Sequence, residues 1–229
     1  MAARYICIEG TDGVGKTTQV DLLVKHLRAL GCKVLQTKEP GTPHNDLTIQ
    51  LRKYVLDAQY DNDMTDTARE LIIQATRSIH LEKVIVPALD EYDYIIQDRG
   101  ILSSLSYGEA CGLPLNLLET LNYTVIPDSM SIYGTTGSMM YKFKTLNIYD
   151  DVIILHSGTN TTKNPDRSTS REYETGDIME NKGQDFMKNV FQNMRKNTLK
   201  DFNNAVLIDV DNKSIHEVFS SLLLVTNLG

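Results

Sequence analysis

The sequence has few cysteines, no excess of positive charge and no long hydrophobic segment. Its three cysteines are scattered and form no CxxC pair, which argues against a disulfide framework. Acidic residues outnumber basic ones 30 to 23, and the formal net charge is −7. A non-specific nucleic-acid binder needs a basic face, so this class is disfavoured. The first apolar run stops at Glu9 and is too short for a signal peptide or a membrane span. We therefore expect a cytoplasmic, reduced protein without a nucleic-acid or membrane partner.

What the sequence does contain is an alternation of strand and helix patterns. Arg4–Glu9 is a β-favouring run, and Lys16–Leu30 has apolar residues at helical spacing, followed by Gly31 where a left-handed C-cap belongs. Later strands are predicted to begin at Val34, Tyr94, Val152 and Ala205. Because strands that alternate with helices form parallel sheets, we expect one domain over residues 1–229, a three-layer α/β/α fold with a five-stranded parallel sheet.

Two helix starts have the spacing of a capping box. Thr67-x-x-Glu70 predicts the start of a helix that runs toward Leu89, and Pro87 is expected to kink or end this helix. Ser214-x-x-Glu217 predicts the start of the last helix.

Two stretches interrupt the alternation. Residues 123–145 mix Pro, Gly, Ser, Thr and Tyr without a clear period, and residues 157–182 are polar and charged. Long irregular segments of a compact domain are lids, binding loops or plain surface excursions. For 123–145, which looks like an insertion, a lid or binding loop and a plain surface excursion both stay open, and we favour a mobile lid for 157–182.

Residues 10–17, GTDGVGKT, match the phosphate-binding pattern G-x-x-x-x-G-K-[ST] in full, between a predicted strand and a predicted helix. Glycines let consecutive backbone N–H groups face phosphate oxygens, and the positive end of the following helix adds to that field. Lys16 is predicted to bridge the β- and γ-phosphates of ATP, and the Thr17 hydroxyl to hold Mg²⁺. The predicted ATP-binding residues are Gly10, Thr11, Asp12, Gly13, Val14, Gly15, Lys16, Thr17 and Thr18.

The P-loop alone leaves kinase, ATPase and GTPase open. A GTPase needs a guanine-reading N-K-x-D, and the Asn-Lys pairs at 181–182 and 212–213 both lack the aspartate. A GTPase is therefore disfavoured.

Four blocks in order, the P-loop among them, resemble the thymidylate kinase family. They are Glu9–Thr18, Lys38-Glu39-Pro40-Gly41, the helix around Arg77, and Asp98-Arg99 followed by Ser103-Ser104 and Tyr107. The resemblance covers most of the chain except roughly residues 123–145. It implies a nucleoside-monophosphate kinase that transfers the γ-phosphate of ATP to dTMP with Mg²⁺, and it implies a homodimer.

The pair Asp98-Arg99 follows a predicted strand, at the carboxyl edge where parallel sheets bind ligands. Asp98 is expected to orient Mg²⁺ directly or through water. Arg99 is expected to hold the acceptor phosphate with a fork geometry that lysine lacks. The alternative is a surface ion pair between the two residues.

The resemblance implies the other acceptor contacts, within residues 37–110. Arg77 would bond a thymine carbonyl unless it is an ordinary solvated arginine, and Tyr107 would pack under the sugar unless it is a core residue. Asp12 would face the acceptor rather than the triphosphate. The predicted acceptor-binding residues are Asp12, Glu39, Pro40, Ile73, Arg77, Arg99, Ser103, Ser104 and Tyr107.

The P-loop has no arginine at its variable positions, so further positive charge must come from elsewhere. The 157–182 segment supplies Lys163, Arg167, Arg171 and Lys182. A lid that closes over the phosphates excludes water. We expect Arg167 or Arg171 to act in catalysis with Lys16 and Arg99, and a solvated charged loop is the alternative.

Four positions depart from the family pattern. Ile73 stands where an aromatic residue usually stacks on thymine, Gly100 and Gly108 replace an aromatic residue and a glutamine, and Ile178 replaces a lid arginine. Stacking contributes ~1–3 kcal/mol per base, so Ile73 puts base specificity in question. The rival hypotheses are a deoxynucleoside-monophosphate kinase of broader base range and an ATP-binding regulatory protein without an acceptor.

Overall fold

A computed structural model describes residues 2–130, 132–136, 139–143, 145–157 and 178–229. Its helices and strands are β1 (Arg4–Gly10), α1 (Lys16–Ala29), β2 (Val34–Lys38), α2 (Asp46–Leu56), α3 (Asp66–His80), α4 (Val86–Glu91), β3 (Tyr94–Asp98), α5 (Ile101–Ala110), α6 (Leu115–Val125), β4 (Ile132–Thr136), β5 (Met139–Phe143), β6 (Asp151–His156), α7 (Ile178–Asn181), α8 (Gln184–Asp201), β7 (Ala205–Asp209) and α9 (Ile215–Thr226).

A five-stranded parallel sheet forms the centre of the molecule, in the order β2-β3-β1-β6-β7. The predicted sheet is therefore confirmed. In register, Asp98 at the end of β3 lies beside Ile8 of β1 and Lys38 of β2, and Gly10 lies beside Leu155 of β6. The carboxyl ends of these strands thus share one edge, which brings the P-loop next to Asp98-Arg99.

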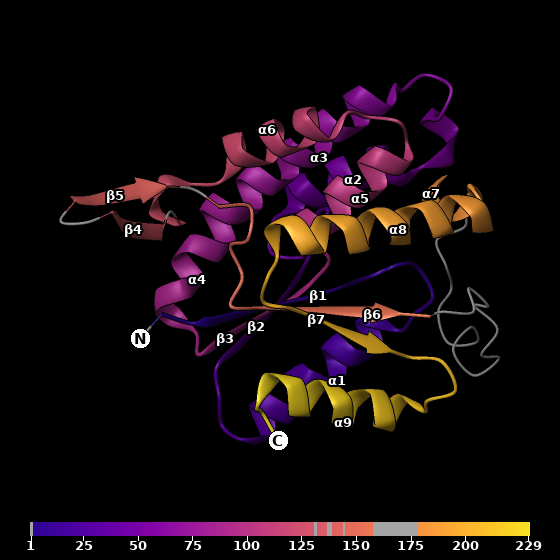
Figure 1. Cartoon of the computed structure of the whole chain (residues 1–229). Helices are drawn as coiled ribbons and strands as arrows, with labels where there is room; N and C mark the ends of the chain where they lie inside the picture. Colours follow the sequence, from indigo (N-terminus) through magenta and orange to yellow (C-terminus); the bar gives the residue numbers. More distant parts are fainter. Residues whose placement is uncertain (1, 131, 137–138, 144, 158–177) are drawn as a thin grey trace.

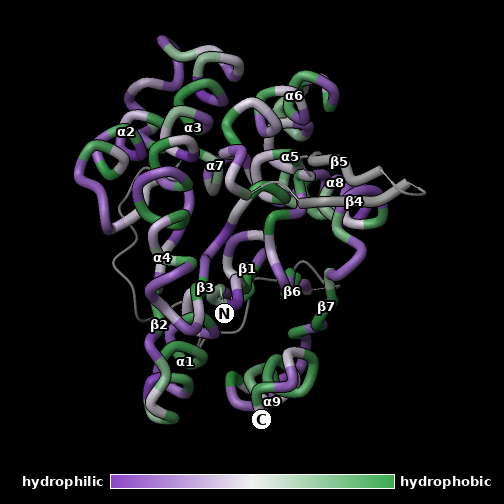
Figure 2. The backbone as a smooth tube through the Cα atoms, turned by 90° about the vertical axis from the view of Figure 1, so that its left-hand side faces the viewer, coloured by the Kyte–Doolittle hydropathy of each residue, from purple (hydrophilic) through white to green (hydrophobic). Residues whose placement is uncertain are grey.

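Helices cover both faces of this sheet, with α1 and α9 on one face and α3, α5 and α8 on the other (Figure 1). The turned view shows the same two helical layers on either side of the strands (Figure 2). Side chains of a strand alternate between its faces. On β1, Tyr5 and Cys7 lie in the core cluster that also holds side chains of α5 and α8, whereas Ile6 and Ile8 lie in the cluster with α1 and α9. This alternation produces the expected three-layer α/β/α fold.

The helix predicted to start at Thr67 starts two residues earlier. Thr65 is its N-cap, because the Thr65 side chain accepts a hydrogen bond from the backbone N–H of Ala68. The predicted capping box of Thr67 with Glu70 is wrong, since the Glu70 carboxylate turns into the interior and meets Ser104.

The same helical stretch passes Pro87 without ending there. α3 ends at His80, a π-helical turn spans Leu81–Ile85, and α4 continues to Glu91. Pro87 lies in the first turn of α4, where a missing backbone N–H is tolerated. The expected capping box of Ser214 with Glu217 at the start of α9 is confirmed.

The segment 123–145 contains regular structure that its sequence did not reveal. Tyr123–Val125 belongs to α6, and β4 and β5 form an antiparallel pair with Ile132 opposite Phe143. Of the predicted lid, residues 158–177 lie outside the described residues, and with them Lys163, Arg167 and Arg171. Among the described residues, no helix has both the length and the apolar character that a membrane crossing requires.

Candidate active site

The P-loop has the backbone shape that its glycines predict. Gly10, Gly13 and Gly15 all have positive φ angles, of 141°, 79° and 92°. A Cβ atom on Gly10 would lie 2.3 Å from the carbonyl oxygen of Leu155, so only glycine fits. α1 begins directly afterwards at Lys16, and the free N–H groups of its first turn therefore add to an anion-binding loop.

The Lys16 ammonium group is folded over this loop. Its Nζ donates a hydrogen bond of 2.6 Å to the carbonyl oxygen of Thr11 and lies 3.9 Å from Oδ1 of Asp12. Burial, followed by the charge of Arg99, lowers the pKa of Lys16 to about 8. An anion in the loop would stabilise the charged form of this lysine.

Thr17 and Asp98 bring two oxygen ligands to one point. The Thr17 hydroxyl donates a hydrogen bond of 2.7 Å to Oδ2 of Asp98, at the carboxyl end of β3. The described residues contain no group of three or more His, Cys, Asp or Glu side chains that could hold a metal. The pair nevertheless fits Mg²⁺, which takes one or two protein ligands and fills its remaining positions with phosphate oxygens and water.

Arg99 sits on a left-handed backbone turn that directs its side chain at the P-loop. Its φ is 63°, and the turn is held by hydrogen bonds from Gln97 Nε2 to the Arg99 carbonyl (2.8 Å) and from the Arg99 N–H to Ile8 (3.0 Å). Arg99 Nη1 then donates to the carbonyl oxygen of Gly10 at 2.9 Å, and Nη2 forms an ion pair with Asp12. A residue at the end of β3 thus reaches the loop after β1.

Asp12 lies between the two cations of the site. Tyr107 donates a hydrogen bond of 2.8 Å to Asp12 Oδ2, and the Arg99 guanidinium carbon lies 5.1 Å from the centre of the Tyr107 ring. Burial acts to raise the pKa of Asp12, but the charges of Arg99 and Lys16 outweigh it and lower the pKa to about 2. Arg99 therefore pairs with Asp12, and the alternative surface pair with Asp98 does not form.

Glu9 is a functional candidate that the sequence analysis missed. Its carboxylate is fully buried and accepts hydrogen bonds from the backbone N–H groups of Gly100 (2.8 Å) and Ser103 (3.1 Å) and from the Ser103 hydroxyl. Burial raises the pKa of Glu9 despite these bonds. Because Ser103 also accepts from Arg99 Nη1 at 3.1 Å, Glu9 holds the turn that carries Arg99. The sequence feature that could have identified Glu9 is an acidic residue at the end of an apolar strand.

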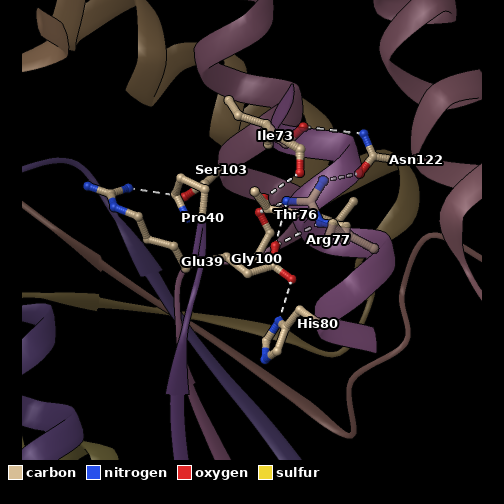
Figure 3. Close-up of polar contacts among 12 residues, drawn as sticks. Glu39, Pro40, Ile73, Thr76, Arg77, His80, Gly100, Ser103 and Asn122 are labelled. Atoms are coloured by element: carbon tan, nitrogen blue, oxygen red, sulfur yellow. Dashed lines mark hydrogen bonds and ion pairs between the residues drawn. The ribbon is translucent and has the colours of Figure 1, made fainter. Parts of the chain in front are cut away.

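Arg77 is buried and bonded to protein groups, as Figure 3 shows. Its Nε donates to Glu39 Oε2 (2.7 Å), Nη1 to Asn122 Oδ1 (2.5 Å) and Nη2 to the Gly100 carbonyl (3.3 Å). Only 2% of Arg77 is exposed, which excludes a solvated helix arginine. Burial acts to raise the pKa of Glu39, but the Arg77 charge and a hydrogen bond with His80 outweigh it and lower the pKa to about 2.

The remaining predicted acceptor residues surround this ion pair. Ser104 is buried on α5, and Ile73 is half-buried on α3. The carbonyl oxygen of Pro40 accepts a hydrogen bond of 2.7 Å from Arg52. The structure therefore brings together predicted acceptor residues from the P-loop, from the turns after β2 and β3, and from α3 and α5.

Two of the unusual glycines have a packing reason. A Cβ atom on Gly100 would lie 2.1 Å from the Tyr149 hydroxyl, and one on Gly108 would lie 2.6 Å from Leu118 Cδ2. Tyr149, in the loop before β6, and Leu118, in α6, fill the space in which larger residues would otherwise stand, and the sequence patterns did not connect either of them with these glycines.

The fold and the loop together define a P-loop protein of the three-layer α/β/α class. Within that class, the family model for thymidylate kinase matches residues 8–136. The chain belongs to the thymidylate kinase family.

The comparisons give the extent of this relationship. The chain is 40% identical to a thymidylate kinase of Acinetobacter baylyi over 126 residues, which are 53% of this chain and 60% of that protein. It is 42% identical to one of a Geobacter species over 120 residues, 52% of each chain. The chain thus matches about three fifths or less of the length of these relatives. In fold, it is similar to the crystal structure of thymidylate kinase from Ehrlichia chaffeensis, with a TM-score of 0.69, 21% identity and 99% of both chains covered.

Proposed function

We propose that this chain is a cytoplasmic nucleoside-monophosphate kinase that transfers the γ-phosphate of ATP to dTMP and releases dTDP and ADP. The observation that carries the proposal is the position of Arg99, whose guanidinium reaches from the end of β3 to Gly10 and Asp12 in the P-loop. A cation at this position supports a second anion-binding site in front of the triphosphate cradle. A regulatory protein that only binds ATP has no use for it.

The site residues divide the work between two anions. The loop N–H groups and Lys16 bind the donor triphosphate, and Thr17 and Asp98 would hold the Mg²⁺ that neutralises charge on it. Arg99 exchanges its contact with Asp12 for the acceptor phosphate, which its planar fork matches. Phosphoryl transfer is mainly positioning and charge neutralisation, and these two cations would position the two reacting phosphate groups.

A further cation would come from the 157–182 segment. An arginine that closes over the transferred group contributes about 10³–10⁵ in rate in related phosphoryl-transfer systems. We expect Arg167→Ala or Arg171→Ala, whichever residue acts, to lower kcat by roughly that factor in single-turnover assays with saturating nucleotides. Wild-type rates in both Arg167→Ala and Arg171→Ala would mean that residues 157–182 form only a solvated loop.

The test of the proposal is an acceptor panel. With ATP and Mg²⁺, ADP release is measured for dTMP, dUMP, dCMP, dGMP, dAMP and UMP. We expect dTMP to be the best acceptor and UMP a poor one, because Tyr107, which lies beside Arg99, matches the family tyrosine that packs under the sugar and disfavours a 2′-hydroxyl. Equal rates with a purine and dTMP would favour the broader kinase, which the half-buried aliphatic Ile73 makes the second candidate. No acceptor-dependent ADP release would overturn the kinase proposal.

We further propose a homodimer, on the family resemblance alone. Light scattering coupled to size-exclusion chromatography measures the mass directly, and a value near 25.8 kDa would mean a monomer.

A further inference from the structure

A buried polar cluster lies between α3 and α5, and the phosphate chemistry described above does not use it. We call it the α3–α5 polar cluster; its members are Glu70 and Gln74 of α3, Ser104 of α5 and Asn122 of α6. Their exposed fractions are 4%, 3%, 6% and 0%, respectively. Buried polar groups normally have hydrogen-bond partners. Each donor and acceptor of this cluster can therefore be checked for a partner.

Ser104, one of the predicted acceptor-binding residues, has no hydrogen-bonding capacity left. Its hydroxyl donates to Glu70 Oε1 (2.7 Å) and accepts from Gln74 Nε2 (3.1 Å) and Asn122 Nδ2 (3.3 Å). A hydroxyl has one hydrogen to donate and two lone pairs to accept with. Ser104 is therefore occupied by protein and cannot itself read a base in this arrangement.

Gln74 has a group left over. Its Nε2 donates to Glu70 Oε1 at 2.6 Å and to Ser104, but its Oε1 is buried and has no hydrogen-bond partner among the described residues. The side-chain amide of Gln74 cannot be flipped to exchange Oε1 and Nε2, because Oε1 would then face the Glu70 carboxylate. Glu70 thus fixes the orientation of the amide and leaves a carbonyl oxygen without a donor, which is an unfavourable state in the absence of a ligand.

This carbonyl group lies on the acceptor side of the site. Gln74 precedes Arg77 by three residues, so the two side chains share a face of α3, and Arg77 reaches Gly100 on the Arg99 turn. On the facing helix, Ser104 follows Ser103, which contacts Arg99. A nucleotide whose phosphate is held by Arg99 can therefore extend its base along α3 and α5 toward Gln74.

We infer that Gln74 is a specificity-determining residue whose Oε1 accepts a hydrogen bond from the ring N3–H of a thymine or uracil base. The inference rests on the proposed acceptor site. Glu70 and Ser104 are positioning residues that hold the amide in this orientation. Because Oε1 is closed to solvent, side chains that cover it move when the base enters. Cytosine presents an acceptor at N3 and is disfavoured by the same oxygen.

The experiment compares dTMP with N3-methyl-dTMP, which lacks the N3–H donor, in the wild type and in Gln74→Met, which keeps the length of the side chain without its polar atoms. For the wild type, we expect kcat/KM to be at least tenfold lower with N3-methyl-dTMP. For Gln74→Met, the KM for dTMP should rise roughly tenfold, the size of one buried hydrogen bond, with the KM for ATP unchanged. Gln74→Met should discriminate between the two acceptors by less than about threefold.

Two further variants separate this role from a structural one. Gln50→Met changes an exposed glutamine of α2 and should keep wild-type kinetics with both acceptors. Glu70→Gln removes the carboxylate that orients the amide and should reduce the discrimination without abolishing turnover. If Gln74→Met or Glu70→Gln keeps the full wild-type discrimination, the inference is wrong. If the wild type does not phosphorylate dTMP at all, the proposed function is wrong. That result differs from dTMP turnover without a contribution of Gln74, which contradicts only the inference.

Discussion

The proposed donor end and the proposed acceptor end of the site are built in different ways. The donor end is one continuous loop, residues 10–17, whose backbone makes the cradle and in which Lys16 supplies the charge. The acceptor end joins β3, α3, α5 and α6 through side chains, such as Arg77 bonded to both Glu39 and Asn122. A cradle made of backbone depends on few side chains, whereas a network of buried polar groups depends on each of its members.

The largest effect should follow from removing the lysine of the donor end. Lys16→Ala removes the cation that lies over the P-loop, and kcat for transfer to dTMP should fall by roughly 10³-fold or more, because no other P-loop side chain neutralises the β- and γ-phosphates. dTMP affinity, measured by calorimetry, should change by less than about threefold. A variant that keeps a tenth of the wild-type kcat would show that the donor end is not organised around Lys16.

The matching change at the acceptor end is Arg99→Ala. Because Arg99 lies in front of the loop rather than in it, kcat/KM for dTMP should fall by about 10²-fold while the KM for ATP stays within about threefold. Arg99→Lys keeps the charge but not the fork and should be intermediate. If Arg99→Ala leaves the kinetics with dTMP unchanged, Arg99 does not bind the acceptor phosphate.

The two ends also differ in how well the sequence predicts them. The five strands of the parallel sheet and the P-loop follow from local patterns, because apolar runs, glycine spacing and capping residues act over a few neighbours. Glu70 shows the limit of such patterns. Its spacing from Thr67 is typical of a capping box, yet its carboxylate bonds Ser104 on another helix.

The Arg77–Glu39 pair shows the same limit, since its members are far apart in the sequence and nothing local in either residue indicates the other. The close approach of Gly100 to Tyr149 is equally invisible until the chain is folded. Contacts of this kind arise only when β2, α3 and α5 have packed together, so local periodicity does not predict them.

The buried network should also make stability depend on pH. The Glu39 pKa of about 2 lies below its ordinary value of 4.5, so the ionised carboxylate stabilises the fold. That contribution, about 3 kcal/mol, is complete above about pH 5 and is lost as the pH falls toward 2. Glu39→Gln should therefore cost about 3 kcal/mol in the free energy of unfolding at pH 7, measured with urea.

The comparison across pH sharpens this prediction. At pH 3 the cost of Glu39→Gln should be about 2 kcal/mol smaller than at pH 7, because much of the advantage of the ionised carboxylate has gone. Glu82→Gln, at an exposed position in the π-helical turn after α3, should cost little at either pH. An equal cost of Glu39→Gln at both pH values would show that its carboxylate does not titrate as the buried pair requires.

The smallest effect concerns packing behind the acceptor end. A Cβ atom on Gly100 would meet the Tyr149 hydroxyl at 2.1 Å, so Gly100→Ala should lower the free energy of unfolding by about 1–3 kcal/mol. Tyr149→Phe removes that hydroxyl, together with the hydrogen bond it accepts from the Ile101 N–H. The double variant should therefore lose less stability than the two single variants together, because the shortest of the close contacts is removed. Strictly additive losses would mean that Tyr149 is not what requires a glycine after Arg99.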